Sequence, residues 1–306
     1  MSSARDKASR AIRLAHTLEL CTNPPAQLDV FQSEERKRTF WSLYILDRTL
    51  ARSTIWSPML HDADCTVDLP TSEDDLLQDP QIGWFQSRTS MSLRDFEAFP
   101  APHDNGLTIL MAKLLGKNIE CSLQRRAQDS IAPWSSHSGF ADIARSLSSV
   151  DHLFTTDIGE LIVKRANAAS MKASVKTWLG NRSIFGHVLY HINYCMLFHP
   201  FLLQQSTRCG RRQVPSLFHA NCVAKSREHA ARVALLLGLL RLSVQETYHS
   251  VYSYAAVLAG GLLRLHASLS NCSHAAAAME LWRTCLAYYN EKPLPWDHYG
   301  RLVSWS

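Results

Sequence analysis

Apolar side chains recur three and four residues apart along most of this chain, a spacing that places them on one face of a helix. The clearest examples are residues 4–20, 107–128 and 183–204. The same pattern predicts further helices at 140–153, 157–178, 215–242, 244–269 and 274–290. Only 12 glycines and 12 prolines interrupt the 306 residues, which favours helices over a turn-rich β-protein. We therefore predict an all-α fold, a stack of about eight to ten antiparallel helices.

One helix, which precedes a proline, differs from this uniform pattern because it mixes charged and aromatic residues. Ser33 is its expected N-cap, and Glu34 and Arg38 are spaced to pair on its surface. Asp47 then falls on the broad apolar face. A buried carboxylate is costly without a partner, so we expect Asp47 to form an ion pair or to cap a neighbouring helix.

Pro58 ends this helix, because proline cannot continue the helical hydrogen-bond ladder. Residues 61–79 follow with seven acidic side chains and no basic one, and we expect a solvated acidic loop. Residues 80–106 contain several breakers and are expected to be irregular. The loop lacks the glycine and terminal glutamate of a calcium-binding loop, so no metal is predicted there.

The eight cysteines are widely and irregularly spaced, and none forms a C-x-x-C pair. They indicate reduced, buried thiols of an intracellular protein. The N-terminus lacks the apolar stretch of a secretory signal. The longest apolar run, residues 251–263, is shorter than the roughly 20 residues that span a bilayer, so no membrane association is expected.

A row of histidines and a basic triplet are the remaining candidates for chemistry. His187, His191, Cys195 and His199 recur every four residues, and on a helix such a row rotates too far to share one metal ion. We interpret them as satisfied core or interface side chains. The formal net charge is +5, and the triplet at residues 36–38 is interpreted as a solvated helix face. With no nucleotide-binding or hydrolase motif present, we predict no catalytic residue and no metal ligand.

Residues 35–48 resemble the signature of the fungal-specific transcription factor domain. This is the middle homology, or xylanolytic-activator-type, regulatory domain of fungal binuclear zinc cluster regulators. The matching helix is followed by residues 55–57, where the family has Gly-Arg-Pro, and by an acidic loop ending in Leu-Pro. A later Tyr-His helix also matches, with His199 in place of arginine. The residues that carry the resemblance, expected to have structural roles, are Arg36, Arg38, Trp41, Tyr44, Asp47, Arg48, Pro58, Asp64, Leu69, Pro70, Tyr190, His191 and Pro200.

The resemblance implies a regulatory domain of a nuclear transcription factor. It covers residues 1–306 as a single domain that begins partway through the family pattern and lacks the zinc cluster. Zinc and DNA would then be bound only through that missing cluster. Coregulator proteins, a dimer partner or a small-molecule effector are the expected partners. The alternative is a truncated helical interaction module without a role at DNA, and an uncharacterised enzyme is the third possibility.

Overall fold

The computed structural model describes residues 2–54, 57–71, 104–124, 131–154, 183–200, 214–241, 250–269 and 272–291. All regular structure in these ranges is helical, which confirms the all-α prediction. The chain divides into two compact units, unit 1 at Met1–Ile119 and unit 2 at Glu120–Ser306. The assignment of the chain to a single domain stays a prediction.

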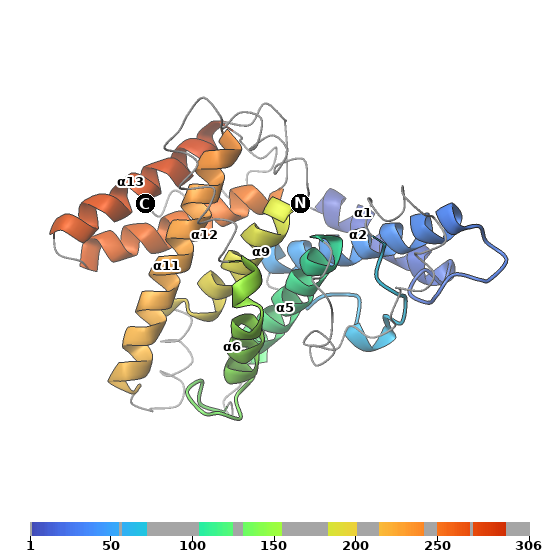
Figure 1. The fold of residues 1–306 in the computed structure, drawn as a ribbon, viewed down its shortest axis with the longest axis horizontal. Coiled ribbons are helices and arrows are strands. Elements are labelled where there is room, and N and C mark those ends of the chain that lie inside the picture. Colours follow the sequence, from blue (N-terminus) through green and yellow to red (C-terminus); the bar gives the residue numbers. More distant parts are fainter. Residues whose placement is uncertain are drawn as a thin grey trace. The chain divides into compact units, whose positions relative to one another are not determined.

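Unit 1 contains α1 (Ser2–Thr17), α2 (Val30–Thr54), the short 3-10 helix η1 (Asp62–Asp64) and most of α5 (Asp104–Gln124). The helices α1 and α2 pack against each other (Figure 1). Ala8, Ile12 and Ala15 form the buried stripe of α1, as their spacing predicted. The same spacing would place Leu18 in this stripe, but its side chain is 57% exposed because the helix has already ended.

The end of α1 is a Schellman motif, in which two backbone amides return to carbonyls of the last turn. The Leu20 amide donates to the Ala15 carbonyl at 2.9 Å, and the Glu19 amide donates to the His16 carbonyl at 3.0 Å. Glu19 has a φ of 53°, the left-handed conformation that this motif requires. The chain therefore turns after Thr17, and buried Leu20 supplies the apolar contact expected from Leu18.

The start of α2 also differs from the expectation. Ser33 was predicted as the N-cap, but the helix begins at Val30. The Asp29 carboxylate accepts a hydrogen bond from the Gln32 amide at 2.8 Å, which is the geometry of an N-cap. The Ser33 amide donates to the Asp29 carbonyl, so Ser33 lies within the helix.

The helix α5 begins at Asp104, inside the segment predicted to be irregular, and is described as far as Gln124; its predicted end near residue 128 lies outside the described residues. Apolar residues at the predicted helical spacing are buried, with Leu107 half-buried at the start: Leu110, Met111, Leu114, Leu115 and Ile119. Ile109 and Ala112 are buried beside them, so much of the circumference of the helix is covered. The remainder of the predicted irregular segment, from residue 80 to residue 103, lies outside the described residues, as do residues 55–56, 72–79 and the helix predicted at 157–178.

Unit 2 is built around the long helix α11 (Ser216–Arg241). It packs against α9 (Ser183–Leu197), α12 (Ser250–Leu269) and α13 (Cys272–Glu291), and α6 (Gly139–Ser149) packs against α9 (Figure 1). The side chain of Ser138 caps α6 by accepting from the Ala141 amide at 3.1 Å. The core of unit 2 therefore lies where α9 and α11 meet their neighbours.

The helix α9 was predicted to continue to residue 204, but it ends at Leu197. His199 precedes Pro200, and a residue before proline is disfavoured in helical conformation, which accounts for the earlier end. None of the described helices combines the length and apolar character needed to cross a membrane. Among the described cysteines, Cys195, Cys222 and Cys285 are buried and form no disulfide.

Candidate functional site

The polar side chains of α2 converge on the segment at residues 57–71. The Asp47 carboxylate accepts hydrogen bonds from the backbone amides of Met59, at 2.9 and 3.0 Å, and Leu60, at 2.9 Å. It also pairs with Arg48 Nη1 at 2.8 Å. The sequence predicted an ion pair or a cap for Asp47. The ion pair is confirmed, and the capped backbone belongs to the segment that follows α2 rather than to a neighbouring helix.

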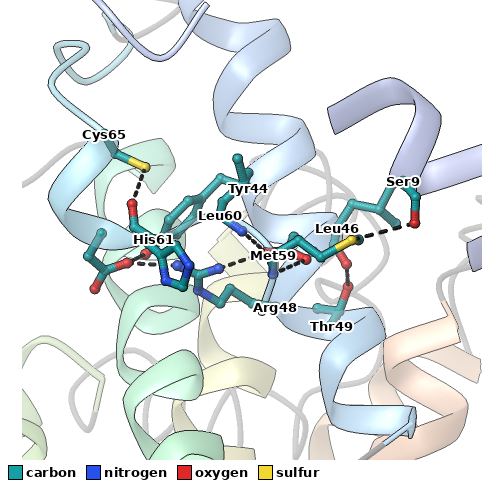
Figure 2. Close-up of polar contacts among 11 residues, drawn as sticks. Ser9, Tyr44, Leu46, Arg48, Thr49, Met59, Leu60, His61 and Cys65 are labelled. Carbon is teal, nitrogen blue, oxygen red and sulfur yellow. Dashed lines mark hydrogen bonds and ion pairs between the residues drawn. The ribbon is translucent and has the colours of Figure 1, made fainter. Parts of the chain in front are cut away.

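Arg48 is the centre of this cluster, and its side chain is only 2% exposed. Its Nη2 pairs with Asp62 Oδ1 at 2.7 Å, and the guanidinium lies 4.1 Å from the centre of the Tyr44 ring. The Tyr44 hydroxyl donates to the same Asp62 oxygen at 2.6 Å. Figure 2 shows Tyr44 and Arg48 turned toward the segment that carries Leu60 and His61.

The environment fixes the charge states in this cluster. Burial, together with the negative charge of Asp62, raises the pKa of Tyr44, so the hydroxyl stays protonated and donates. Burial acts to lower the pKa of Arg48, but Tyr44, Asp62 and Asp47 outweigh it and the pKa is raised. The guanidinium therefore remains a cation that links two carboxylates from different segments.

A second row of contacts ties the first half of α2 to the end of the same segment. Trp41 Nε1 donates to the Asp68 carbonyl at 2.9 Å. Arg38 Nη2 donates to the Thr71 carbonyl at 3.1 Å, and the Thr71 amide donates to Glu34 Oε1 at 2.9 Å. Glu34 and Arg38 do pair, at 2.8 Å, but the Glu34 side chain is 6% exposed, so the expected surface pair is largely buried.

The basic triplet does not form the solvated face that its sequence suggested. Arg36 Nη2 donates to the Leu18 carbonyl at 2.7 Å, at the end of α1, and Arg38 is held as described above. All three side chains of the triplet are half-buried. Two of its cations therefore satisfy backbone carbonyls of unit 1.

The acidic loop is only partly solvated in its described portion, residues 61–71. Asp64 is exposed and Leu69 is half-buried, whereas Pro58, Val67 and Pro70 are buried. The expectation of a solvated loop holds for residues 61–64 and 66, which are exposed. It is wrong for residues 67–71, which are buried or half-buried and whose backbone is bonded to the turn after α1 and to α2.

The second group of signature residues lies in the core of unit 2. The Nδ1 atoms of His191 and His229 are 2.8 Å apart, and the Tyr194 ring stacks on His229 at 3.7 Å. The Tyr190 hydroxyl donates to Asp151 in a short hydrogen bond, and its ring stacks on Phe154. The tyrosine and histidine of the family pattern are therefore packed inside the unit, and Pro200 follows the end of α9.

Burial keeps these histidines neutral. It lowers the pKa of His187 to about 4 and that of His229 to about 3, and the nearby cations Lys225 and Arg232 add to the effect at His229. The pKa of His191 is lowered by burial and by His229. In the part of the chain that the structure describes, no three ligating side chains are arranged to hold a metal ion.

Sequence reasoning missed His229, although a signal was present. On α11 it follows Cys222 and Ser226 at helical spacing and precedes Val233, so it occupies the buried stripe of that helix. A histidine in such a stripe requires a polar partner inside the core. His191, also on a buried face, supplies it.

Comparison with known proteins identifies a family that matches the first half of the chain. The family model of the fungal specific transcription factor domain matches residues 7–152, which include most of α1 and all of α2, the segment at 57–71, α5 and α6. Residues 7–152 thus match the regulatory domain of fungal transcription factors, in agreement with the resemblance at residues 35–48.

Three curated relatives are regulators of biosynthetic genes. The ascochitine biosynthesis cluster transcriptional regulator of Didymella fabae is 32% identical over 120 residues, or 37% of this chain and 20% of that protein. Citrinin biosynthesis transcriptional activators of Monascus ruber and Monascus purpureus are each 27% identical over 124 residues, or 38% of this chain and 24% and 21% of those proteins. The matches thus span about a fifth to a quarter of the relatives' lengths. No solved structure matches the chain.

Proposed function

We propose that this chain is the regulatory part of a nuclear protein that controls transcription of a biosynthetic gene cluster. The family match over residues 7–152 is the observation that carries this proposal. The functions of the three relatives support the finer assignment to a gene cluster. The domain acts by binding rather than by catalysis.

The geometry of α2 supports a structural role for the signature. Asp47 and Arg48 are buried and paired, and Asp62 is occupied by Arg48 and Tyr44. Catalytic carboxylates have to reach a substrate, whereas these side chains bind their own backbone and one another. Their role is to hold residues 57–71 against α2 and so to fix the surface of unit 1.

DNA and zinc are proposed to be bound by a separate zinc cluster of the regulator. Arg36 and Arg38 support this division, because their guanidinium groups already bond to carbonyls of unit 1. The partners of the helical body are coregulator proteins, a dimer partner or a small-molecule effector. The purified chain is expected to contain no stoichiometric zinc by elemental analysis and to bind no duplex DNA specifically.

The test deletes the gene, or replaces it with point variants, at its own locus in the fungus that encodes it. Deletion is expected to change the transcripts of a contiguous set of biosynthetic genes in one direction, measured by RNA sequencing. Replacing Arg48 with methionine (Arg48→Met) should shift the same transcripts, because it removes the cation between Asp47 and Asp62. The control Arg145→Met alters an exposed pair on α6 and should leave the transcripts at wild-type levels. A deletion that changes no transcripts would contradict the proposal and favour an interaction module without a role in transcription.

A further inference from the structure

The turn after α1 and the segment at residues 57–71 are joined directly through their backbones. The amides of Thr66 and Val67 both donate to the Cys21 carbonyl, at 2.9 and 3.0 Å. Cys65 immediately precedes Thr66. Two cysteines that are 44 positions apart in sequence therefore lie in neighbouring segments of irregular backbone.

Standard bond lengths limit how far apart these two cysteines can be. The Cys21 carbonyl oxygen lies about 2.4 Å from its own Cα, and the Thr66 nitrogen lies about 2.4 Å from the Cα of Cys65. With the hydrogen bond of 2.9 Å between them, the two Cα atoms are at most about 7.7 Å apart. Bends at the carbonyl and at the amide shorten this separation toward the range of about 4.4–6.8 Å found in disulfides.

The surroundings of the two cysteine side chains are compatible with a disulfide between them. Cys21 and Cys65 are both free and half-buried. The Cys65 thiol donates to the His61 carbonyl at 3.2 Å (Figure 2). Burial raises the pKa of Cys65 to about 12, and the Cys21 thiol contributes to that rise, as expected of two sulfurs in the same local environment.

We propose that Cys21 and Cys65 form a reversible disulfide, with a low-molecular-weight disulfide such as oxidised glutathione as the oxidant. Cys21 attacks the oxidant first, because the Cys65 thiol is held protonated. The first step forms a mixed disulfide at Cys21 and releases one reduced glutathione. Cys65 then gives up its proton and attacks the Cys21 sulfur as a thiolate, and the second glutathione leaves as a thiolate that takes up that proton. Two protein thiols are oxidised and one glutathione disulfide is reduced to two thiols.

The bond would close a covalent loop that contains the whole of α2. Such a loop restricts the unfolded chain and stabilises the folded one. It would also fix the turn after α1 to the segment that Asp47, Trp41 and Glu34 hold. The oxidised chain is therefore expected to keep residues 57–71 anchored after the charge cluster of α2 is weakened.

The test incubates the folded, full-length chain in glutathione buffers of increasing oxidised fraction, blocks remaining thiols and maps disulfides by mass spectrometry under non-reducing conditions. The expected product is a linked peptide pair that contains Cys21 and Cys65, reversed by reduced glutathione. Cys21→Ser and Cys65→Ser should each abolish it. Cys121→Ser, which changes another half-buried free cysteine, should not.

Thermal unfolding supplies a second readout. The oxidised wild-type chain should unfold at a higher temperature than the reduced chain, and the difference should vanish in Cys65→Ser. The proposal is overturned if glutathione remains attached to Cys21 and no bond forms between Cys21 and Cys65. Links between two chains, or between other cysteines in place of this pair, would overturn it equally.

Discussion

Gly116 of α5 lies directly against the buried side chain of Arg48. A Cβ added at Gly116 would stand 2.6 Å from Arg48 Nε and 2.8 Å from Arg48 Cδ, closer than non-bonded atoms approach. The guanidinium cannot move aside freely, because Asp47 and Asp62 hold its two terminal nitrogens. Glycine is therefore required here by packing and not by backbone conformation.

We expect Gly116→Ala to destabilise unit 1 by about 1–3 kcal/mol, the usual cost of overpacking a well-filled core. Denaturant unfolding of the purified chain measures this. The matched control is Gly261→Ala on α12, where an added Cβ meets nothing within 4 Å. Since alanine is the better helix former, that control should be neutral or stabilising by up to about 1 kcal/mol. Equal stability of the two variants would show that Arg48 is not held as described.

Removing the Asp47 charge should have a larger effect. Asp47→Asn leaves the buried Arg48 without one of its anions and weakens the acceptor for the Met59 and Leu60 amides. Breaking a buried pair in this way costs about 3–5 kcal/mol. Glu280→Gln is the control, because Glu280 pairs with Arg283 on an exposed face and such pairs contribute about 0–1 kcal/mol. A loss for Asp47→Asn no larger than that of the control would argue against the cluster.

Glycine at position 19 should stabilise the chain. Glu19 occupies the left-handed position of the Schellman motif at a φ of 53°, and a residue with a Cβ pays about 1 kcal/mol or more there. Glu19→Gly is therefore expected to raise the free energy of unfolding by about 1 kcal/mol. Glu19→Ala separates charge from conformation, because it removes the carboxylate but keeps the Cβ, and it should give no such gain. The explanation fails if glycine and alanine have the same effect.

Acid should destabilise unit 2 through its buried histidines. The folded pKa of His187, about 4, lies below the ordinary value of 6.5, so between these values the unfolded chain binds more protons. Stability is then complete above about pH 6.5 and falls as the pH drops toward 4. His187 alone accounts for about 2 kcal/mol between pH 7 and pH 5. His187→Gln should make the pH dependence of unfolding shallower, whereas His219→Gln, at an exposed position of α11, should not.

The helical pattern predicted the fold well because burial on one face leaves a period in the sequence. The stripe of α1 and the buried face of α5 follow that period. Helix ends were less predictable, since they depend on single contacts. Phe31 in the first turn of α2 is 61% exposed, so the buried apolar pattern of this helix begins after its first turn. The N-cap is therefore Asp29 and not the predicted Ser33.

The sequence predicted that the carboxylate of Asp47 is compensated, but not which residues compensate it. A carboxylate on an apolar face had to be compensated, which led to Asp47, and the four-residue spacing led to the Glu34–Arg38 pair. The partners that complete the cluster come from Met59, Leu60 and Asp62, which lie beyond the break after α2. No periodicity connects an irregular segment to the helix before it, so those contacts required the structure.

Amide hydrogen exchange at Met59 and Leu60 tests most directly whether α2 holds the segment at residues 57–71. Both amides should exchange slowly in the wild-type chain. Asp47→Asn should speed them about 10- to 100-fold, because a hydrogen bond to a charged acceptor contributes about 1.5–3 kcal/mol. The Val67 amide, which donates to the Cys21 carbonyl instead, should keep its wild-type rate and so exclude general unfolding. Rates at Met59 and Leu60 that do not respond to Asp47→Asn would contradict the account.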